Sequence, residues 1–207
     1  AAHCATAEAI NGTHNRRREH MSLTTAEQLR ACHVRRWHIV QVAREQTLAE
    51  HSFAVAVIAG SLATAMRWTG LLHHTLQLKL LQWSLSHDLI EVRTGDVPTP
   101  FKRFLEEAGG AGVMEKAEGL VDWEHTGAYR QIKGSEIEVL VKLADQIEAI
   151  YFLQDNGVGA HARQVLDGLR AILARMVTGM EREYPKLGVR EGVRRVCQDI
   201  GIHGGWL

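Results

Sequence analysis

WSLSHDLIEVRTGDVPTP, residues 83–100, joins a hydrophobic segment to an adjacent histidine and aspartate. We predict a buried helix for its first half, because apolar residues dominate it as far as His87-Asp88. Glu91 follows His87 by four positions and Asp88 by three, so all three side chains can lie on one side of the same helix. A Thr-Gly-Asp and a Pro-Thr-Pro sequence then end the helix in a turn.

An imidazole next to a carboxylate suits a divalent metal, and a nearby carboxylate that is not a ligand can transfer a proton. Two more candidate ligands lie in helices that capping boxes predict at residues 47–50 and 135–138. His51 lies near the start of the first helix, and Asp145 lies inside the second. Both helices are apolar, so a polar side chain within them needs a strong partner. The alternatives are a core hydrogen bond for His51 and an intrahelical ion pair with Lys142 for Asp145.

The composition is that of an ordinary soluble globular protein, with 45% hydrophobic and 23% charged residues. The 24 basic and 24 acidic residues cancel, which argues against binding of polymeric nucleic acid and leaves room for a local basic pocket. The three cysteines form no CxxC pair, so we expect a reducing cytoplasm and no disulfide framework. The longest apolar run, residues 53–66, contains a glycine and a serine and is too short to span a bilayer. We therefore expect no membrane association.

We expect one domain at residues 23–207, preceded by a poorly ordered leader at residues 1–22 that has no periodic apolar face. The Arg16-Arg17-Arg18 run in the leader is interpreted as a solvated charge cluster rather than a phosphate contact. No segment has the pattern of a strand, and there are no repeats. Helices are predicted at residues 24–33, 47–66, 71–86, 101–108, 135–150, 158–180 and 189–200, with a less regular one at 113–125. The stripe at 158–180 is interpreted as a packing helix. These patterns predict an all-α bundle.

The chain resembles the HD-domain metal phosphohydrolases, whose H…HD…D pattern is matched by His51, His87-Asp88 and Asp145. The resemblance implies an HD-domain helical bundle with a metal site between its helices, and it implies that these four side chains are the metal ligands. Two imidazoles and two carboxylates suit Zn²⁺, Co²⁺, Mn²⁺, Fe²⁺ or Mg²⁺, and ligand type alone does not choose among them.

Two further features narrow the resemblance. Arg36-Trp37 lies fifteen residues before His51, and a Thr-Gly-Asp-Val-Pro-Thr-Pro sequence occupies residues 94–100. Both are similar to the YfbR-type branch, which contains 5′-deoxynucleotidases and phage dATP triphosphohydrolases. The resemblance extends from Val34 to Leu153, a little over half of the chain.

The resemblance assigns Arg36 to phosphate or sugar and Trp37 to a stacking contact with the nucleobase. An indole face is a stacking platform and a guanidinium group is a planar fork for phosphate oxygens, so both assignments are physically sound. The alternative for Trp37 is a core residue at a helix end. Ile39 is expected to wall the adenine edge, where an added amino group would lose its hydration against a β-branched side chain. Gln46 belongs to the same expected substrate contacts.

Glu91 is the expected catalytic residue. It would help to activate water or protonate the leaving 5′-oxygen, with Asp96 supporting it. The resemblance implies that a metal-activated water attacks the α-phosphorus. Further substrate contacts are expected from the cations Arg36, Lys102 and Lys142 and from Thr99 and Pro100.

Several functions compete. The favoured one is a dATP triphosphohydrolase that releases deoxyadenosine and triphosphate, which the resemblance links to removal of dATP where 2-aminoadenine replaces adenine in a phage genome. The alternative is a 5′-deoxynucleotidase acting on deoxynucleoside monophosphates. A nucleotide-binding HD module without turnover is disfavoured because all four ligand positions are present, and cyclic-dinucleotide or alarmone hydrolysis is more remote. We also expect a homo-oligomer, from dimer to hexamer, in the cytoplasm, which is that of the host if the protein is phage-encoded.

Overall fold

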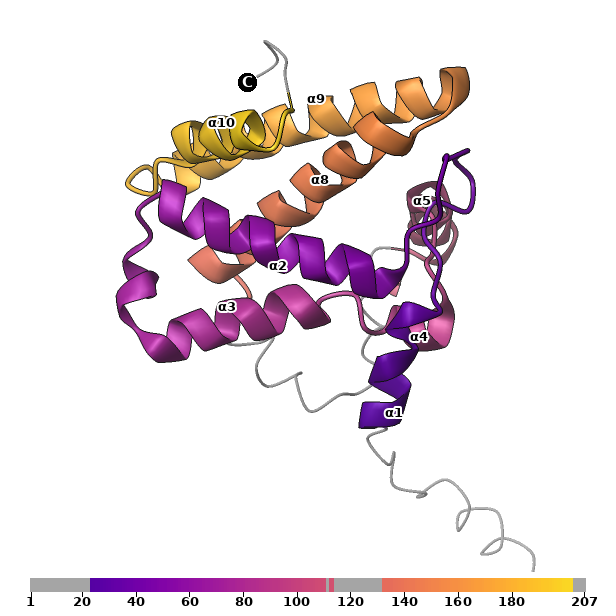
Figure 1. The fold of residues 1–207 in the computed structure, drawn as a ribbon, viewed down its shortest axis with the longest axis horizontal. Helices are drawn as coiled ribbons and strands as arrows, with labels where there is room; N and C mark the ends of the chain where they lie inside the picture. The colour runs from indigo at the N-terminus through magenta and orange to yellow at the C-terminus, as the bar shows by residue number, and fades with distance from the viewer. Residues whose placement is uncertain (1–22, 111, 114–131, 203–207) are drawn as a thin grey trace, which may run out of the picture.

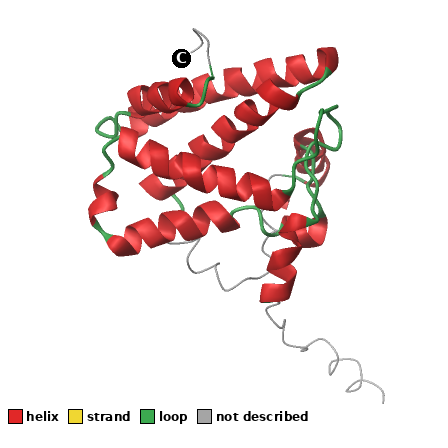
Figure 2. Cartoon of the chain, viewed as in Figure 1, coloured by secondary structure: helices red, strands yellow, loops and turns green. Residues whose placement is uncertain are grey.

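The computed structural model describes residues 23–110, 112–113 and 132–202, and in these ranges the protein is helical and has no strands (Figures 1 and 2). The all-α prediction is therefore confirmed. The expected leader at residues 1–22 and most of the predicted helix at 113–125 lie outside the described residues. The helices are α1 (Thr25–Gln28), η1 (Leu29–Cys32), α2 (Leu48–Ala65), η2 (Thr69–Leu72), α3 (His74–Ser86), α4 (Glu91–Thr94), α5 (Thr99–Gly109), α8 (Glu136–Asn156), α9 (Gly159–Glu183) and α10 (Val189–Asp199), where η denotes a 3₁₀ helix.

Helix α2 is the central element and packs against α3, α8 and α10 (Figure 1). It begins with the predicted capping box, in which the Thr47 hydroxyl accepts from the Glu50 N–H and the Glu50 carboxylate accepts from the Thr47 N–H. At 18 residues it is longer than the apolar run seen in the sequence, and by length and composition alone it could cross a membrane. In this fold 44% of the helix is buried, and these buried residues form part of the core.

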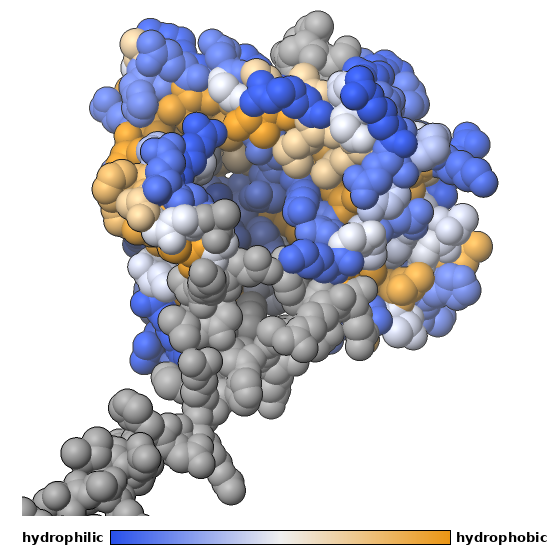
Figure 3. All heavy atoms as spheres, turned by 180° about the vertical axis from the view of Figure 1, so that it is seen from behind, coloured by the Kyte–Doolittle hydropathy of each residue, from blue (hydrophilic) through white to orange (hydrophobic). Residues whose placement is uncertain are grey.

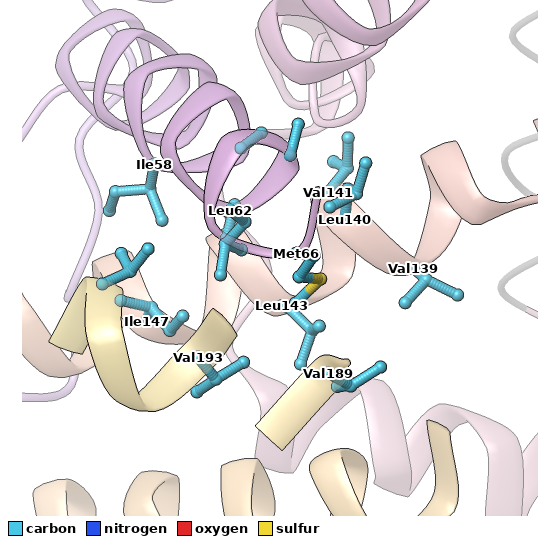
Figure 4. Packing of buried hydrophobic residues seen from close by; sticks show 14 of the residues in the cluster. Ile58, Leu62, Met66, Val139, Leu140, Val141, Leu143, Ile147, Val189 and Val193 are labelled. Atoms are coloured by element: carbon cyan, nitrogen blue, oxygen red, sulfur yellow. The ribbon is translucent and has the colours of Figure 1, made fainter. Parts of the chain in front are cut away.

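The main hydrophobic core lies between α2, α8 and α10 (Figure 4). Ile58 and Leu62 of α2 face the same cluster as Leu143 and Ile147 of α8, and Val193 of α10 joins it. All five side chains are buried. Truncating one of the leucines to alanine would cost about 2–5 kcal/mol, because the cavity left behind cannot fully collapse.

One side of α2 is exposed, although the sequence of this helix is apolar nearly all round and therefore predicts burial on every side. Phe53 is 67% exposed and Val57 is 53% exposed. Residues four apart lie on the same face, so these two mark a single apolar side. The prediction was wrong because a uniformly apolar helix does not reveal which of its faces the neighbouring helices cover.

The start of α8 also differs from its prediction. Ser135 precedes the helix, but its side chain makes no capping hydrogen bond. The Glu138 carboxylate instead accepts from the Gly134 N–H at 2.6 Å, one residue upstream of the predicted cap. The acidic residue of the predicted capping box therefore binds the backbone just before the helix without the reciprocal serine contact.

Residues 33–47 form the loop that leads into α2, and it is tied to two helix ends (Figure 2). The Leu48 N–H donates to the Val34 carbonyl oxygen at 2.9 Å, which joins the loop to the start of α2. The Ala43 N–H donates to the Asn156 carbonyl oxygen at 2.7 Å, which joins it to the end of α8. These bonds fix the position of the loop without regular secondary structure.

Candidate functional site

The four predicted ligands come together from three separate parts of the chain. His51 lies near the start of α2, Asp145 lies in α8, and His87-Asp88 lies just after α3. One potential ligand atom from each residue lies within 4.8 Å of those of the other three. Two imidazoles and two carboxylates at this spacing can hold a divalent metal ion.

The chain around His87-Asp88 turns more sharply than its sequence predicted. Helix α3 ends at Ser86, residues 87–90 form a turn, and Glu91 begins the short helix α4. The side chains of His87, Asp88 and Glu91 therefore do not lie on one helix. They still converge, because Glu91 and Asp88 line the same cavity.

Hydrogen bonds leave the metal-facing nitrogen of both imidazoles available. His51 Nδ1 lies 2.6 Å from Glu148 Oε2, and His87 Nδ1 lies 3.0 Å from the Ser84 carbonyl oxygen. These oxygens accept, so each Nδ1 carries the hydrogen and donates it. Each Nε2 is buried and makes no hydrogen bond within the described part of the chain. A pair of unsatisfied buried nitrogens beside two carboxylates fits a metal ion.

The same group of side chains favours positive charge between them. His51 Nε2 lies 3.3 Å from Asp145 Oδ1 and 3.6 Å from Asp88 Oδ2. Burial alone would lower the pKa of His51, but the contacts with these carboxylates outweigh it and raise that pKa well above 6.5. Burial would likewise raise the pKa of Asp88, but the charge of His87 and the contact with His51 hold it below its usual range.

Glu91 lies beside the metal group and favours its protonated form. Burial, followed by the charges of Asp88 and Asp96, raises its pKa from 4.5 to about 8. Lys102 Nζ lies 3.6 Å from Glu91 Oε1, and its charge partly opposes the rise in the Glu91 pKa. Glu91 Oε2 is buried and makes no hydrogen bond to the described residues. A carboxyl group that keeps its proton near neutral pH can act as a general acid.

A cavity of about 470 Å³ adjoins the metal group, a volume typical of ligand sites. Viewed from behind, the surface is hollowed near its middle, and hydrophilic side chains lie inside the hollow (Figure 3). Ten of the predicted site residues line the cavity: Arg36, Trp37, Ile39, Asp88, Glu91, Asp96, Thr99, Pro100, Lys102 and Asp145.

Helix α9 forms a wall of the cavity, although its apolar stripe was interpreted as a packing surface alone. Val165, Leu169 and Ile172 lie at helical spacing in its apolar stripe and line the cavity. An apolar stripe has the same pattern whether it meets another helix or a ligand, so no local signal distinguishes the two. Four polar side chains that also line the cavity were not predicted, namely His38, Arg103, Gln146 and His161. The first three are chain neighbours of predicted site residues, which is the signal that could have found them.

Gln46 lies behind the cavity wall and is not among the residues that line it. It is 2% exposed, its Nε2 donates to Glu148 Oε1 at 2.5 Å, and its Oε1 accepts from Trp37 Nε1 at 2.8 Å. The expected direct contact with substrate is therefore corrected to a contact with Trp37. Glu148, which is 1% exposed, was also missed. Its spacing of three residues from Asp145, on the same face of α8, is the signal that could have found it.

Lys142 is placed away from the cavity. Its Nζ pairs with Glu138 Oε1 at 2.6 Å, and its side chain is 58% exposed. Both expectations for Lys142, a phosphate contact and an ion pair with Asp145, are therefore corrected. The partner is instead Glu138, one turn upstream, and the exposed ammonium group of Lys142 keeps most of its hydration.

Comparison with known proteins places this site in a family. Residues 24–154 match the family model described as 5′-deoxynucleotidase YfbR-like. The chain is 36% identical over 152 residues to a dATP triphosphohydrolase of Salmonella phage PMBT28, which covers 72% of this chain and 75% of the relative. It is 37% identical over 142 residues to a dATP triphosphohydrolase of Cyanophage S-2L, which covers 68% and 75%. The solved structure of the Cyanophage S-2L HD phosphohydrolase (DatZ), bound to dA and one catalytic Zn²⁺ ion, is similar with a TM-score of 0.70 and 29% identity, covering 88% of this chain and 99% of that one. The chain belongs to the YfbR-like family of HD phosphohydrolases.

Proposed function

We propose that the protein is a metal-dependent dATP triphosphohydrolase that releases deoxyadenosine and triphosphate. The observation that carries this proposal is a metal-binding group, with ligand atoms within 4.8 Å of one another, whose two aspartates line a cavity that an indole and several cations also line. The names of the two phage relatives support dATP as the substrate.

The metal would be held by His51 and His87 through Nε2 and by Asp88 and Asp145 through carboxylate oxygens. When bound, it supplies Lewis-acid chemistry by making a water molecule more acidic and polarising a phosphoryl oxygen. Zn²⁺ is the ion we favour, because it is the ion named in the DatZ relative and it accepts mixed nitrogen and oxygen ligands.

Glu91 is proposed to supply the proton that the reaction needs. Attack of water on the α-phosphorus forms one P–O bond and breaks the bond to the 5′-oxygen of deoxyribose, which leaves as an alkoxide unless it is protonated. Burial and the charges of Asp88 and Asp96 keep the Glu91 carboxyl protonated near neutral pH, so it can donate to that oxygen and then recover the proton that the attacking water loses. Asp96 is thereby given the supporting role expected for it.

Cationic groups beside the cavity are proposed to bind the triphosphate. Arg36 Nη1 lies 3.3 Å from Asp88 Oδ2, and Lys102 Nζ lies 3.6 Å from Glu91 Oε1, so both charges already lie next to the reacting groups. Phosphate oxygens at the α-phosphorus would share these cations as negative charge shifts during the reaction. Thr99, in the first turn of α5 and on the cavity wall, adds a hydroxyl and a helix N-terminus beside Pro100.

The nucleobase is proposed to stack on Trp37, with Ile39 at the edge of the purine. Both residues line the cavity, and Ile39 is 53% exposed, so its side chain is available to a ligand. A 2-amino group placed against this branched side chain would lose its hydration without gaining a hydrogen bond. This discrimination would serve the removal of dATP where 2-aminoadenine replaces adenine in DNA.

The second candidate function is a 5′-deoxynucleotidase, which the description of the family model favours. A cavity of about 470 Å³ can hold a mononucleotide as well as a triphosphate. We also propose a homo-oligomer acting in the cytoplasm, with the domain spanning residues 23–207. The exposed apolar side chains Phe53 and Val57 support the oligomer, since they would be covered in it.

Product analysis tests the function. Zinc-loaded protein is incubated in parallel with dATP, dGTP, dAMP and the 2-aminoadenine deoxynucleoside triphosphate. Deoxyadenosine with intact triphosphate, formed from dATP in preference to the others, is the expected result. Orthophosphate from several deoxynucleoside monophosphates, with the triphosphates untouched, would instead identify the 5′-deoxynucleotidase. An absence of any product at full zinc occupancy would favour a binding module.

A further inference from the structure

One face of α8 runs from the metal group to the indole of Trp37. Asp145, Glu148 and Phe152 are three and four positions apart, so they lie along the same side of the helix. Asp145 belongs to the metal group, and Glu148 contacts His51. The Phe152 ring is stacked on the Trp37 indole, with ring centroids 5.8 Å apart and an interplanar angle of 4°. A single helix therefore contacts both the metal group and the proposed base platform.

Gln46 makes a second connection between the same two places. Its side chain links Trp37 Nε1 to Glu148 Oε1 through hydrogen bonds of 2.8 and 2.5 Å. The other oxygen of Glu148 accepts from His51 Nδ1 at 2.6 Å. The carbonyl oxygen of Gln46 also accepts from the Arg36 N–H at 2.9 Å, so its backbone and its side chain both hold the loop of residues 33–47.

The direction of these hydrogen bonds is fixed by groups that cannot reverse. An indole N–H only donates, so Gln46 must turn its oxygen to Trp37 and its NH₂ group to Glu148. The Glu148 oxygen accepts from His51 Nδ1, so in the neutral imidazole the hydrogen is on Nδ1 and the lone pair is on Nε2. The tautomer that can bind a metal is therefore selected by a chain of partners that begins at the indole.

We infer that Glu148 and Gln46 are positioning residues that set the tautomer of a metal ligand and the orientation of the base platform together. The inference has two parts. The part about the His51 tautomer, the metal half, does not depend on the substrate, whereas the part about the Trp37 orientation, the base half, rests on the function proposed above. A packing role alone would be better served by apolar side chains, because a carboxylate that is 1% exposed has a large desolvation cost. Trp37 has a backbone φ of +66°, which a residue with a side chain rarely adopts, and the two connections hold it there.

Glu148→Gln tests the metal half. The amide replaces one acceptor oxygen with a donor, which favours the His51 tautomer with hydrogen on Nε2 and blocks the ligand atom. Zinc affinity, measured by competition with a chromophoric chelator, is expected to weaken about 10- to 100-fold. The matched control on the same helix is Gln154→Met, which removes a hydrogen bond of 3.0 Å to the Gly201 carbonyl oxygen and one of 3.3 Å from Arg170 Nη2. The control should retain wild-type zinc affinity, and unchanged affinity in Glu148→Gln would overturn this half.

Gln46→Met tests the base half, since methionine keeps the length of the side chain and removes both hydrogen bonds. The indole N–H signal of Trp37, assigned by its loss in Trp37→Phe, is expected to move upfield in NMR spectra of zinc-loaded protein. Binding of deoxyadenosine is expected to weaken about tenfold, as the loss of one buried hydrogen bond implies. An unmoved indole signal with unchanged nucleoside affinity would overturn the role of Gln46.

These measurements separate the positioning role from the proposed function. Zinc affinity and the indole signal need no turnover, so both remain decisive if the wild-type protein does not hydrolyse dATP. Gln46→Met leaves the four ligands and Glu148 in place, so it decides the base half even if Glu148→Gln does not fold. A lower melting temperature alone, in either variant, would indicate an ordinary structural role and count against the inference.

Discussion

Replacing Glu91 with glutamine should change how the stability of the metal-free protein depends on pH. Burial, with the charges of Asp88 and Asp96, raises the pKa of this carboxyl group from 4.5 to about 8 in the folded protein. The folded protein therefore holds a proton that the unfolded chain releases at a lower pH. Because the folded state binds more protons in this window, its stability falls as the pH rises from about 4.5 to about 8.

The magnitude follows from the size of the shift. A pKa difference of one unit corresponds to about 1.4 kcal/mol, so the whole window corresponds to about 5 kcal/mol. Between about pH 5.5 and pH 7.5 the wild-type protein should lose about 2 kcal/mol more than Glu91→Gln, because the carboxyl group begins to ionise near the upper end. The raised pKa of His51 also makes stability fall as the pH rises, but it does so in both proteins and cancels in their difference.

Urea denaturation followed by circular dichroism, with a chelator present, measures this difference at about pH 5.5, 6.5 and 7.5. The control is Glu107→Gln, which changes an exposed glutamate of α5 and should run parallel to the wild type. Parallel lines for Glu91→Gln and the wild type would refute the argument that burial keeps Glu91 protonated. The role of Glu91 as a general acid would then lose its physical basis.

The other predictions concern the metal-loaded protein. His87→Ala, or removal of the metal by a chelator, should abolish turnover. Full activity of His87→Ala would exclude His87 as a ligand, and full activity after chelation would exclude a metal-dependent reaction. Lys102→Ala should raise KM for dATP about tenfold, because a cation beside the phosphates is lost, whereas the matched Lys142→Ala should leave KM unchanged. Equal effects of the two lysines would contradict the placement of Lys142 outside the cavity. Ile39→Ala should raise kcat/KM for the 2-aminoadenine nucleotide relative to dATP, and an unchanged ratio would make Ile39 ordinary packing. Zinc affinity measured by calorimetry should weaken as the pH falls, because the ion must displace the proton of His51, and a flat profile would contradict that competition.

Local signals account for the parts of the site that sequence predicted well. The capping box at Thr47 places His51 near the start of α2, and apolar periodicity places Asp145 in α8. Each of these signals depends on residues close together in the sequence, so it does not depend on contacts with distant segments. The contact between the two helices then brings the ligands together.

The parts that sequence missed depend on contacts between distant segments. Glu148 lies 97 residues from His51, and no pattern near either residue reveals their hydrogen bond. Lys142 can reach a carboxylate three residues ahead or four behind, and only the burial of α8 decides between them. Trp37 lies in a loop without periodicity, so its position depends on Gln46 and Phe152.

The central place of α2 has a consequence for synthesis on the ribosome. The helix emerges early and apolar, but α8 and α10, which cover much of its core side, are made about ninety and a hundred and forty residues later. Until then the nascent chain exposes an aggregation-prone surface and has no Asp145 to complete the metal group. Metal uptake must therefore come late in biogenesis, and a chaperone that shields the apolar helix should raise the yield of active protein more than added zinc does.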